Sequence, residues 1–393
     1  MNQSVGIDKM GIYIPERYIE METLAKARGI DPDKFRLGLG QDQMAFPTLE
    51  QDIVAMGANA ALQVVAPEER STIDQVIFAT ESSFDFSKAA ATYIHELLDI
   101  QPFAKSYEMK QACYSGTAAF QVACDYVRLR PDRKVLVVTS DIARYGLNTA
   151  AEATQGAGAI ALLISANPGI LALNQESVSY TSNDYDFWRP SYSEVALVDG
   201  KYSAQLYQDV FKRVMDELNQ RNPEQFTKIK ALAMHLPFTR MGEKAIKYYK
   251  KHSQQDVASR WLEHFAASTQ LSRRVGNIYT GSLYLSLASL LQYDDTLLPM
   301  DEIALFSYGS GAVAEVLTGI LQENYKERIQ EIKIDERMNK RRPYSLEEYE
   351  DAFNQSLSKE DGIHYIDNKN TTQAGIVLEK IDEHRRYYKR HLS

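Results

Sequence analysis

Two stretches, ACYSGTAAF (112–120) and KVLVVTSD (134–141), decide the fold class. The second is rich in β-branched residues, which is typical of a buried parallel strand. The first starts with small residues and passes into a predicted helix that continues to Arg130, with apolar positions at helical spacing: Phe120, Ala123, Cys124 and Val127. The strand-like run VIFAT (76–80) precedes both. Alternating strands and helices of this kind predict an α/β protein.

The same order of elements recurs in the second half of the chain. VIFATESS (76–83), ACYSGTAAF (112–120), KVLVVTSD (134–141) and GAGAIALLI (156–164) correspond to ALAMHLPF (231–238), GNIYTGSLY (276–284), EIALFSYGSG (302–311) and GAVAEVL (311–317). The competing interpretation is that any two α/β halves look alike. A duplication predicts two halves, residues 1–170 and 171–393, whose polar strand ends surround one pseudo-twofold cleft.

Composition narrows the class of protein. Of the 393 residues 44% are hydrophobic and 25% charged, and the formal net charge of −9 argues against a general nucleic-acid binder. Two cysteines in so long a chain fit a reducing compartment. The start MNQSVGIDKMGIYIP lacks the pattern of a signal peptide, and no apolar run has the length of a membrane span. We therefore expect a soluble, cytoplasmic protein without a membrane segment.

The chain changes character after about residue 324. Residues 324–342 read NYKERIQEIKIDERMNKRR, a strongly charged run that is expected to be a solvated, peripheral extension. The tail that follows is expected to be rich in helix, up to its end, EHRRYYKRHLS (383–393).

Cys113 lies immediately before the predicted helix. Free amides and the helix dipole at a helix start favour a thiolate, so this thiol is a candidate nucleophile. The alternative is a buried, inert cysteine, an interpretation that suits Cys124 on the apolar face of the same helix.

Three further polar residues occupy corresponding ends of elements. Glu81 follows a buried strand, where loss of water raises the pKa of a carboxyl toward that of a useful base. His235 ends the strand-like IKALAMHLP, and Asn277 precedes a second helix start. Taken singly, each fits an ordinary surface or turn residue. The order Cys, His, Asn also occurs in papain-like proteases, but the flanking pattern of that family is missing and a protease has no need for Glu81.

These residues lie within longer motifs that make the chain recognisable. It resembles the thiolase superfamily and, within it, the bacterial hydroxymethylglutaryl-CoA (HMG-CoA) synthases, over essentially its whole length. The resemblance implies a layered αβαβα core with duplicated halves. The motifs are QACYSGTAAF (111–120), YDFWRP (185–190), VDGKYSAQ (198–205), MHLPFTRMGEKA (234–245), RVGNIYTGSLY (274–284) and SYGSGAVAE (307–315).

The resemblance implies roles for individual residues. Cys113 matches the nucleophile that becomes acetylated, Glu81 the general acid/base, and His235 the histidine that positions the acetoacetyl group. Arg240 is a departure, because related sequences usually carry lysine there. The positions that match substrate-contacting residues are Asp31, Thr154, Ser203, Arg240, Lys244, Asn277 and Ser310.

The implied reaction condenses acetyl-CoA with acetoacetyl-CoA, through an acetyl-cysteine, to give HMG-CoA in the mevalonate pathway of isoprenoid synthesis. No metal or other cofactor is expected, since neither cysteine has a zinc-ligand spacing such as C-x₂-C. The family also implies a homodimer. The alternatives are a β-ketoacyl synthase of the same fold, which would decarboxylate its donor without Glu81, and a non-catalytic protein that keeps the fold.

Overall fold

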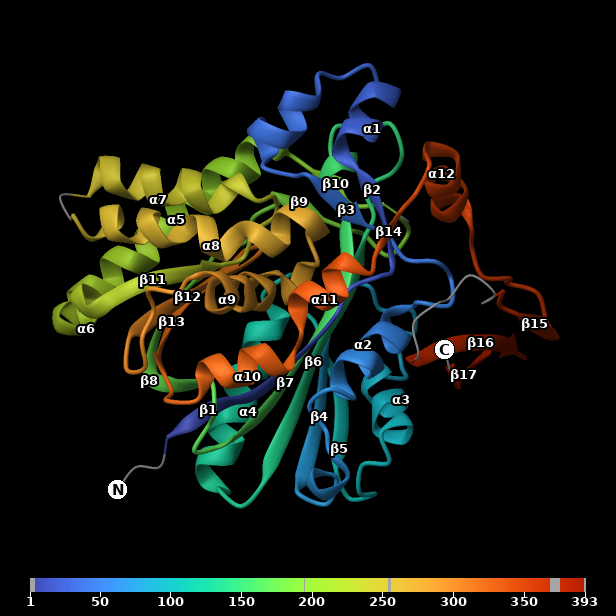
Figure 1. Cartoon of the computed structure of the whole chain (residues 1–393), viewed down its shortest axis with the longest axis horizontal. Coiled ribbons are helices and arrows are strands. Elements are labelled where there is room, and N and C mark those ends of the chain that lie inside the picture. The colour runs from blue at the N-terminus through green and yellow to red at the C-terminus, as the bar shows by residue number, and fades with distance from the viewer. Residues whose placement is uncertain (1–3, 194, 254–255, 368–374, 392–393) are drawn as a thin grey trace.

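The structure is a computed structural model that describes residues 4–193, 195–253, 256–367 and 375–391. In this part of the chain nine strands share one hydrogen-bonded array: β1 (Val5–Tyr13), β4 (Ile73–Ala79), β5 (Lys105–Met109), β6 (Lys134–Ala143), β7 (Gly156–Ala166), β8 (Leu171–Thr181), β11 (Ile229–Met234), β12 (Glu302–Gly309) and β13 (Val313–Leu321). Their order across the array is β11-β12-β13-β8-β1-β7-β6-β4-β5 (Figure 1).

The array consists of two units with the same topology. Strands β4 and β6 run parallel and continue into antiparallel β7 and β1, whereas β11 and β12 run parallel and continue into antiparallel β13 and β8. Among the described residues, two pairs join the units at β1 and β8: Gly6 with Ala172 and Ile7 with Leu171. The predicted duplication is therefore confirmed. The domain boundary near residue 170 stays a prediction.

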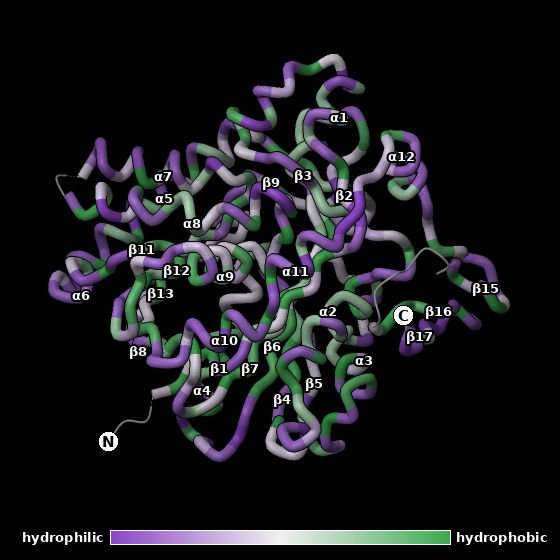
Figure 2. Tube along the Cα trace, viewed as in Figure 1, coloured by the Kyte–Doolittle hydropathy of each residue, from purple (hydrophilic) through white to green (hydrophobic). Residues whose placement is uncertain are grey.

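Alternate side chains of each strand face different layers of helices. In β6, Val135 and Val137 point into an inner cluster, whereas Leu136 and Val138 point into an outer one. The inner layer contains α4 (Ser115–Leu129) and α9 (Ser282–Tyr293) between the two sheet units. Figure 2 shows hydrophobic residues concentrated along the central strands.

The outer layers complete the predicted αβαβα core. Helices α2 (Ile53–Ala61) and α3 (Ala90–Leu97) cover the first unit, and α5 (Gly200–Arg221) and α7 (Arg240–His252) cover the second (Figure 1). Helix α8 (Val257–Val275) packs against α7, α9 and β11. The helix predicted to continue to Arg130 corresponds to α4.

Shorter elements complete the described chain. They are β2 (Arg17–Glu20), α1 (Met21–Ala27), η1 (Lys34–Leu39), β3 (Gln43–Ala45), η2 (Pro67–Glu69), η3 (Glu152–Thr154), β9 (Phe187–Trp188), β10 (Leu197–Val198), α6 (Pro223–Lys228), η4 (Tyr279–Gly281), α10 (Tyr325–Glu331), α11 (Ile334–Asn339), β14 (Arg342–Pro343), α12 (Leu346–Asn354), β15 (Ile363–Tyr365), β16 (Gly375–Asp382) and β17 (Arg385–His391).

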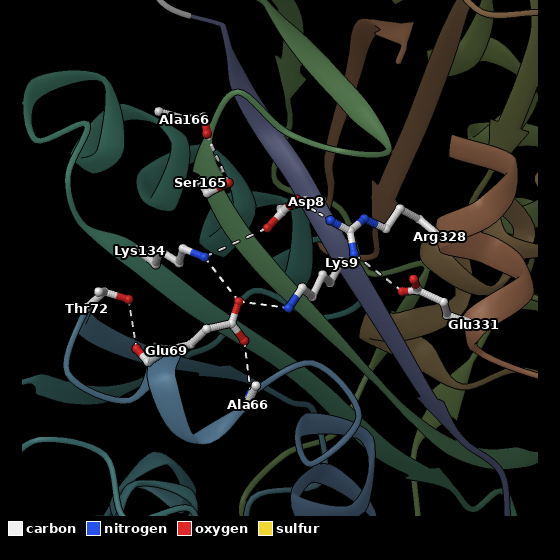
Figure 3. A network of polar contacts seen from close by, with 10 residues as sticks. All are labelled: Asp8, Lys9, Ala66, Glu69, Thr72, Lys134, Ser165, Ala166, Arg328 and Glu331. Carbon is white, nitrogen blue, oxygen red and sulfur yellow. Dashed lines mark hydrogen bonds and ion pairs between the residues drawn. The ribbon is translucent and has the colours of Figure 1, made fainter. Parts of the chain in front are cut away.

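A polar network ties several of these elements together at one edge of the core (Figure 3). The buried carboxylate of Glu69 in η2 accepts from Lys9 of β1 at 2.8 Å and from Lys134 of β6 at 3.1 Å. Asp8 approaches Lys134 and Arg328 of α10 at 3.9 and 4.0 Å. The carboxylates are shared between cations, so the charges at this edge compensate one another.

The expectation that residues 324–342 form a solvated excursion is wrong. Helices α10 and α11 bury an apolar side against the inner core cluster, while their charged side chains face outward. Helical spacing separates the two kinds of residue, and the density of charge conceals this in the sequence. The buried residues are Tyr325, Ile329, Ile332, Ile334 and Met338.

The expectation that the C-terminal tail is rich in helix is also wrong. After α12 the described tail forms a three-stranded sheet, β15-β16-β17, that is fixed to α2. Asn59 of α2 exchanges two hydrogen bonds with the backbone of Ile376, at 2.7 and 2.8 Å. The β16–β17 turn uses Glu383 and His384 at φ 48° and 63°. Hairpin turns of this kind favour Asn-Gly, so Glu-His gives no turn signal in the sequence.

Within the described ranges, no helix is both long and apolar enough to cross a bilayer. In the same ranges no group of three or more His, Cys, Asp or Glu side chains is placed to hold a metal ion.

Candidate active site

Cys113 lies in the turn between β5 and α4, directly before Tyr114, the N-cap residue of that helix. The turn packs tightly against the end of β12 in the other sheet unit. A Cβ added to Gly309 would lie 2.6 Å from both the Cβ and the backbone nitrogen of Tyr114. Only glycine allows this approach, which brings the cysteine of the first half against the Gly309–Gly311 turn of the second.

Glu81 follows the end of β4 and points toward the cysteine. Its Oε1 accepts a hydrogen bond from Cys113 Sγ at 2.6 Å. Its backbone nitrogen donates to Oδ1 of Asp141 in β6 at 2.7 Å, and Arg189 donates to its carbonyl oxygen at 2.6 Å. The backbone of Glu81 is thus held from two sides while its carboxyl group faces the thiol.

The protonation of this pair is strongly perturbed. Loss of water and the neighbouring Asp141 carboxylate raise the pKa of Glu81 to about 8. Burial also raises the pKa of Asp141, to about 6, although four hydrogen-bond donors around it act in the opposite direction. Burial and the Glu81 carboxyl raise the pKa of Cys113 well above its ordinary value. The expected thiolate at the helix start is therefore wrong for this state, because Glu81 and burial outweigh the helix dipole.

His235 directly follows β11, beside β12. Its backbone is fixed at both ends: the nitrogen donates to Phe306 O at 2.8 Å and the carbonyl oxygen accepts from Tyr207 at 2.5 Å. The side chain is only 2% exposed, and Nδ1 has no hydrogen-bond partner among the described residues. Burial lowers the pKa of His235 to about 3, so the imidazole is neutral at physiological pH.

Asn277 lies in the turn between α8 and η4. Its Oδ1 accepts from Tyr279 N at 2.9 Å and from Ser282 Oγ at 2.8 Å, and Nδ2 is 3.4 Å from Tyr145 Oη. The rings of Tyr145, Tyr279 and Phe187 contact one another with centroids 5.8–6.1 Å apart. Burial raises the pKa of both tyrosines, and the charges of Cys113 and Glu81 contribute, which places this aromatic group beside the pair.

Asp186 fixes the Gly309–Gly311 turn. Its Oδ1 accepts from Gly311 N at 3.0 Å, and its Oδ2 accepts from Tyr308 Oη at 2.7 Å and from Ser203 Oγ at 3.3 Å. Ser203 therefore supports this turn through Asp186. Ser310, half-buried at the same turn, accepts from Gln111 Nε2 through its carbonyl oxygen at 3.4 Å.

The other predicted substrate residues lie farther out. Asp31 is exposed and caps a turn through Asp33 N, and Thr154 bonds to Ala151 O at the end of η3. Arg240 binds Glu243 and the carbonyl oxygen of Leu37, each at 2.8 Å, and so ties α7 to η1. Lys244 is exposed, with Nζ 4.8 Å from the centroid of the Phe238 ring.

The structure adds residues that sequence reasoning missed. Asp141, Asp186 and Arg189 shape the surroundings of Glu81 and the Gly309–Gly311 turn, and Tyr145 and Phe187 contribute to the aromatic wall. The motifs KVLVVTSD and YDFWRP contain four of them, all except Tyr145. Their partners are distant in sequence, so the motifs alone do not indicate what these side chains contact.

Comparisons with known proteins identify the family of this chain. The family model "Hydroxymethylglutaryl-coenzyme A synthase N terminal" matches residues 1–169, and its C-terminal counterpart matches residues 246–391. The chain is 48% identical to the hydroxymethylglutaryl-CoA synthase of Enterococcus faecalis, over 90% of this chain and 92% of that protein. It is 31% identical to the polyketide biosynthesis 3-hydroxy-3-methylglutaryl-ACP synthase PksG of Bacillus subtilis, over 89% and 88% of the two chains.

Solved structures give the same result. A crystal structure of an HMG-CoA synthase complexed with CoA superposes with a TM-score of 0.93 at 42% identity, covering 99% of this chain and 100% of that one. MvaS in complex with 3-hydroxy-3-methylglutaryl coenzyme A superposes with a TM-score of 0.87 at 32% identity and the same coverage. With its layered core, its paired Cys113 and Glu81 and these matches along its length, the chain belongs to the hydroxymethylglutaryl-CoA synthase family.

Proposed function

We propose that this protein condenses acetyl-CoA with acetoacetyl-CoA to form HMG-CoA and CoA. The observation that carries the proposal is the hydrogen bond of 2.6 Å between Cys113 Sγ and Glu81 Oε1. It joins a nucleophile to a carboxyl group whose pKa of about 8 suits a general base near neutral pH. The similarity to a hydroxymethylglutaryl-CoA synthase and to a structure that contains 3-hydroxy-3-methylglutaryl coenzyme A supports the choice of these substrates.

The first step acetylates the enzyme. The sulfur of Cys113 bonds to the acetyl carbon of acetyl-CoA, and the bond from that carbon to the CoA sulfur breaks. The thiol proton passes to Glu81 and then to the departing CoA sulfur, which leaves Glu81 ionised. The backbone amide of Gly311 already donates a hydrogen bond to Asp186. The candidate donors to the thioester oxygen are therefore the backbone amides of Cys113 and Ser310.

The second step forms the new carbon–carbon bond. Ionised Glu81 removes a proton from the acetyl methyl group, and the resulting carbanion bonds to the ketone carbon of acetoacetyl-CoA. His235, neutral and with an unpartnered Nδ1, hydrogen-bonds the ketone oxygen, which becomes a hydroxyl as it takes back the proton from Glu81. Water then cleaves the thioester: its OH joins the acyl carbon and its remaining proton restores the Cys113 thiol.

Asn277 and Ser310 are proposed to contact the acyl chain, and Asp31, Thr154, Ser203 and Lys244 to contact the CoA thioesters less directly. For Arg240 we propose a supporting role, because its guanidinium already binds Glu243 and Leu37. We propose that the reaction requires no cofactor beyond the CoA thioesters, since side chains supply each proton transfer. A place in the mevalonate pathway and in the cytoplasm belongs to the same proposal.

Substitutions should separate the two chemical steps. Cys113→Ala is expected to abolish acetylation by labelled acetyl-CoA, whereas Cys124→Ala, a buried cysteine on α4, keeps it. Glu81→Ala should still be acetylated, because loss of the carboxyl lowers the pKa of the thiol and water can then carry its proton to CoA, but condensation should fall roughly 10²–10⁴-fold. His235→Ala should also be acetylated and fail in condensation. Intact-mass spectrometry and product assays measure the two steps, and a Glu81→Ala protein that condenses normally would contradict the proposal.

The rate of condensation should depend on pH through Glu81. The base acts when ionised, so the single-turnover rate of the acetylated protein should rise with pH. The midpoint of the rise should lie near pH 8, far above the ordinary carboxyl pKa of 4.5. His235, with its pKa lowered to about 3, should contribute no limb near 6.5. The decay of acetyl-enzyme without acetoacetyl-CoA controls for simple hydrolysis. A rate that is flat from pH 6 to 9 would rule out this role for Glu81.

Lys244 should contribute to binding of CoA phosphates, since its charge is exposed next to the segment that Arg240 fixes. Lys244→Ala is expected to raise the KM for acetyl-CoA about threefold to tenfold at low salt and less at high salt, where ions screen the charge. Lys326→Ala, which removes one exposed charge from α10, is the control. Equal KM values for Lys244→Ala and the control at both salt concentrations would remove Lys244 from the binding site.

We propose a homodimer with twofold symmetry. Among the described residues β5 is an edge strand, bonded to β4 alone, and its free backbone groups can pair with a second copy. Light scattering at micromolar concentration should give the mass of two chains. A mass of one chain across that range would be the contrary result.

A further inference from the structure

Glu315 is a buried carboxylate that the proposed reaction does not use. It lies in β13 and is 3% exposed. Its carboxylate accepts from Tyr114 Oη at 2.7 Å, from Gln121 Nε2 at 2.6 Å and from Ser177 Oγ at 2.5 Å. Among the described residues no ion pair joins it to a cation. Three donors therefore take the place of a counter-charge.

Two of the three donors come from the segment that carries the nucleophile. Tyr114 follows Cys113 and is the N-cap residue of α4, and Gln121 lies two turns farther along the same face of that helix. Ser177 belongs to β8, the neighbour of β13. Glu315 thus accepts hydrogen bonds from two positions along α4 and connects this helix to the sheet unit of the other half.

The strand of Glu315 also carries the turn that faces the nucleophile. Strands β12 and β13 form a hairpin in which Gly309 pairs with Val313 and Ser307 pairs with Glu315. At its tip, Gly309 touches Tyr114, and Ser310 O accepts from Gln111, two residues before Cys113. Strand β13 is consequently connected both to the segment that carries Cys113 and to the Gly309–Gly311 turn that lies against it.

We propose that Glu315 is a positioning residue that holds Cys113 in register with the Gly309–Gly311 turn, through its hydrogen bonds to Tyr114 and Gln121. A buried carboxylate without a cation is a costly way to join three elements when apolar packing would do so. Its directed hydrogen bonds fix the rotation and the position of α4 along the strand, which apolar contacts do not. The inference rests on the proposed acetylation of Cys113.

Two single substitutions test the inference by measuring acetylation with acetyl-CoA. Glu315→Gln replaces one acceptor oxygen with an amide NH₂, which faces only other hydrogen-bond donors. Tyr114→Phe removes the hydrogen bond between Glu315 and the N-cap residue of α4. Each should lower the maximal rate of acetylation about tenfold to a hundredfold, as expected for a displaced reacting group. The KM for acetyl-CoA should stay within about twofold, since neither residue is placed at the CoA-binding surface.

A swapped pair and two controls separate positioning from stability. The double variant Glu315→Gln/Gln121→Glu exchanges the two side chains, so that an amide at position 315 can donate to a carboxylate at position 121. This variant should recover most of the lost acetylation rate. Glu69→Gln removes a carboxylate with similar burial and three donors in the network of Figure 3, and Tyr325→Phe removes a buried hydroxyl that donates to Leu297 O at 2.7 Å. Both controls should lower Tm without changing the rate of acetylation.

The outcomes are distinguishable. Glu315→Gln and Tyr114→Phe proteins that lose only Tm and acetylate at the normal rate would overturn the inference, while leaving the proposed function intact. If Glu315→Gln does not fold, Tyr114→Phe decides alone, because it leaves Glu315 two of its donors. An unmodified protein that takes no acetyl group would instead defeat the proposed function itself.

Discussion

The hydrogen bond between Cys113 and Glu81 is the constraint on which the rest of the site depends. The Cys113 thiol donates to the Glu81 carboxyl at 2.6 Å with little water around the pair, so the carboxyl raises the pKa of the thiol while the hydrogen bond favours the ionised carboxyl. Acetylation of the sulfur ends this coupling and leaves the carboxyl free to act on the acetyl group it faces. One pair of side chains can therefore serve two successive steps, provided that their separation is fixed.

The layered core fixes that separation. Glu81 follows β4 and is anchored by Asp141 of β6, whereas Cys113 follows β5 and directly precedes the N-cap residue of α4, which is buried between the two sheet units. The second unit supplies His235 after β11 and the Gly309–Gly311 turn after β12, held by Asp186. Because the units are joined at β1 and β8 and packed around α4 and α9, the cysteine turn of the first half lies against the Gly309–Gly311 turn of the second.

Much of this arrangement was predictable from the sequence, and the exceptions have physical reasons. Glu81 and His235 each follow an apolar run, so strand ends could be recognised, and repeated motifs related the halves. Asp186 and Tyr145 act through partners distant in the chain, which no local pattern reveals. The charge around Ile329 concealed an amphipathic helix, and Glu383 and His384 form a hairpin turn without turn residues. The thiolate expected at Cys113 was wrong because its neighbour is a carboxyl rather than a cation.

The most direct test of the account is to identify the product that the purified protein forms from both thioesters. Incubation with acetyl-CoA labelled in its acetyl group and unlabelled acetoacetyl-CoA should give HMG-CoA that carries the label, as measured by mass spectrometry. A protein that forms no labelled HMG-CoA, or that consumes acetyl-CoA to give a different condensation product, would contradict the account.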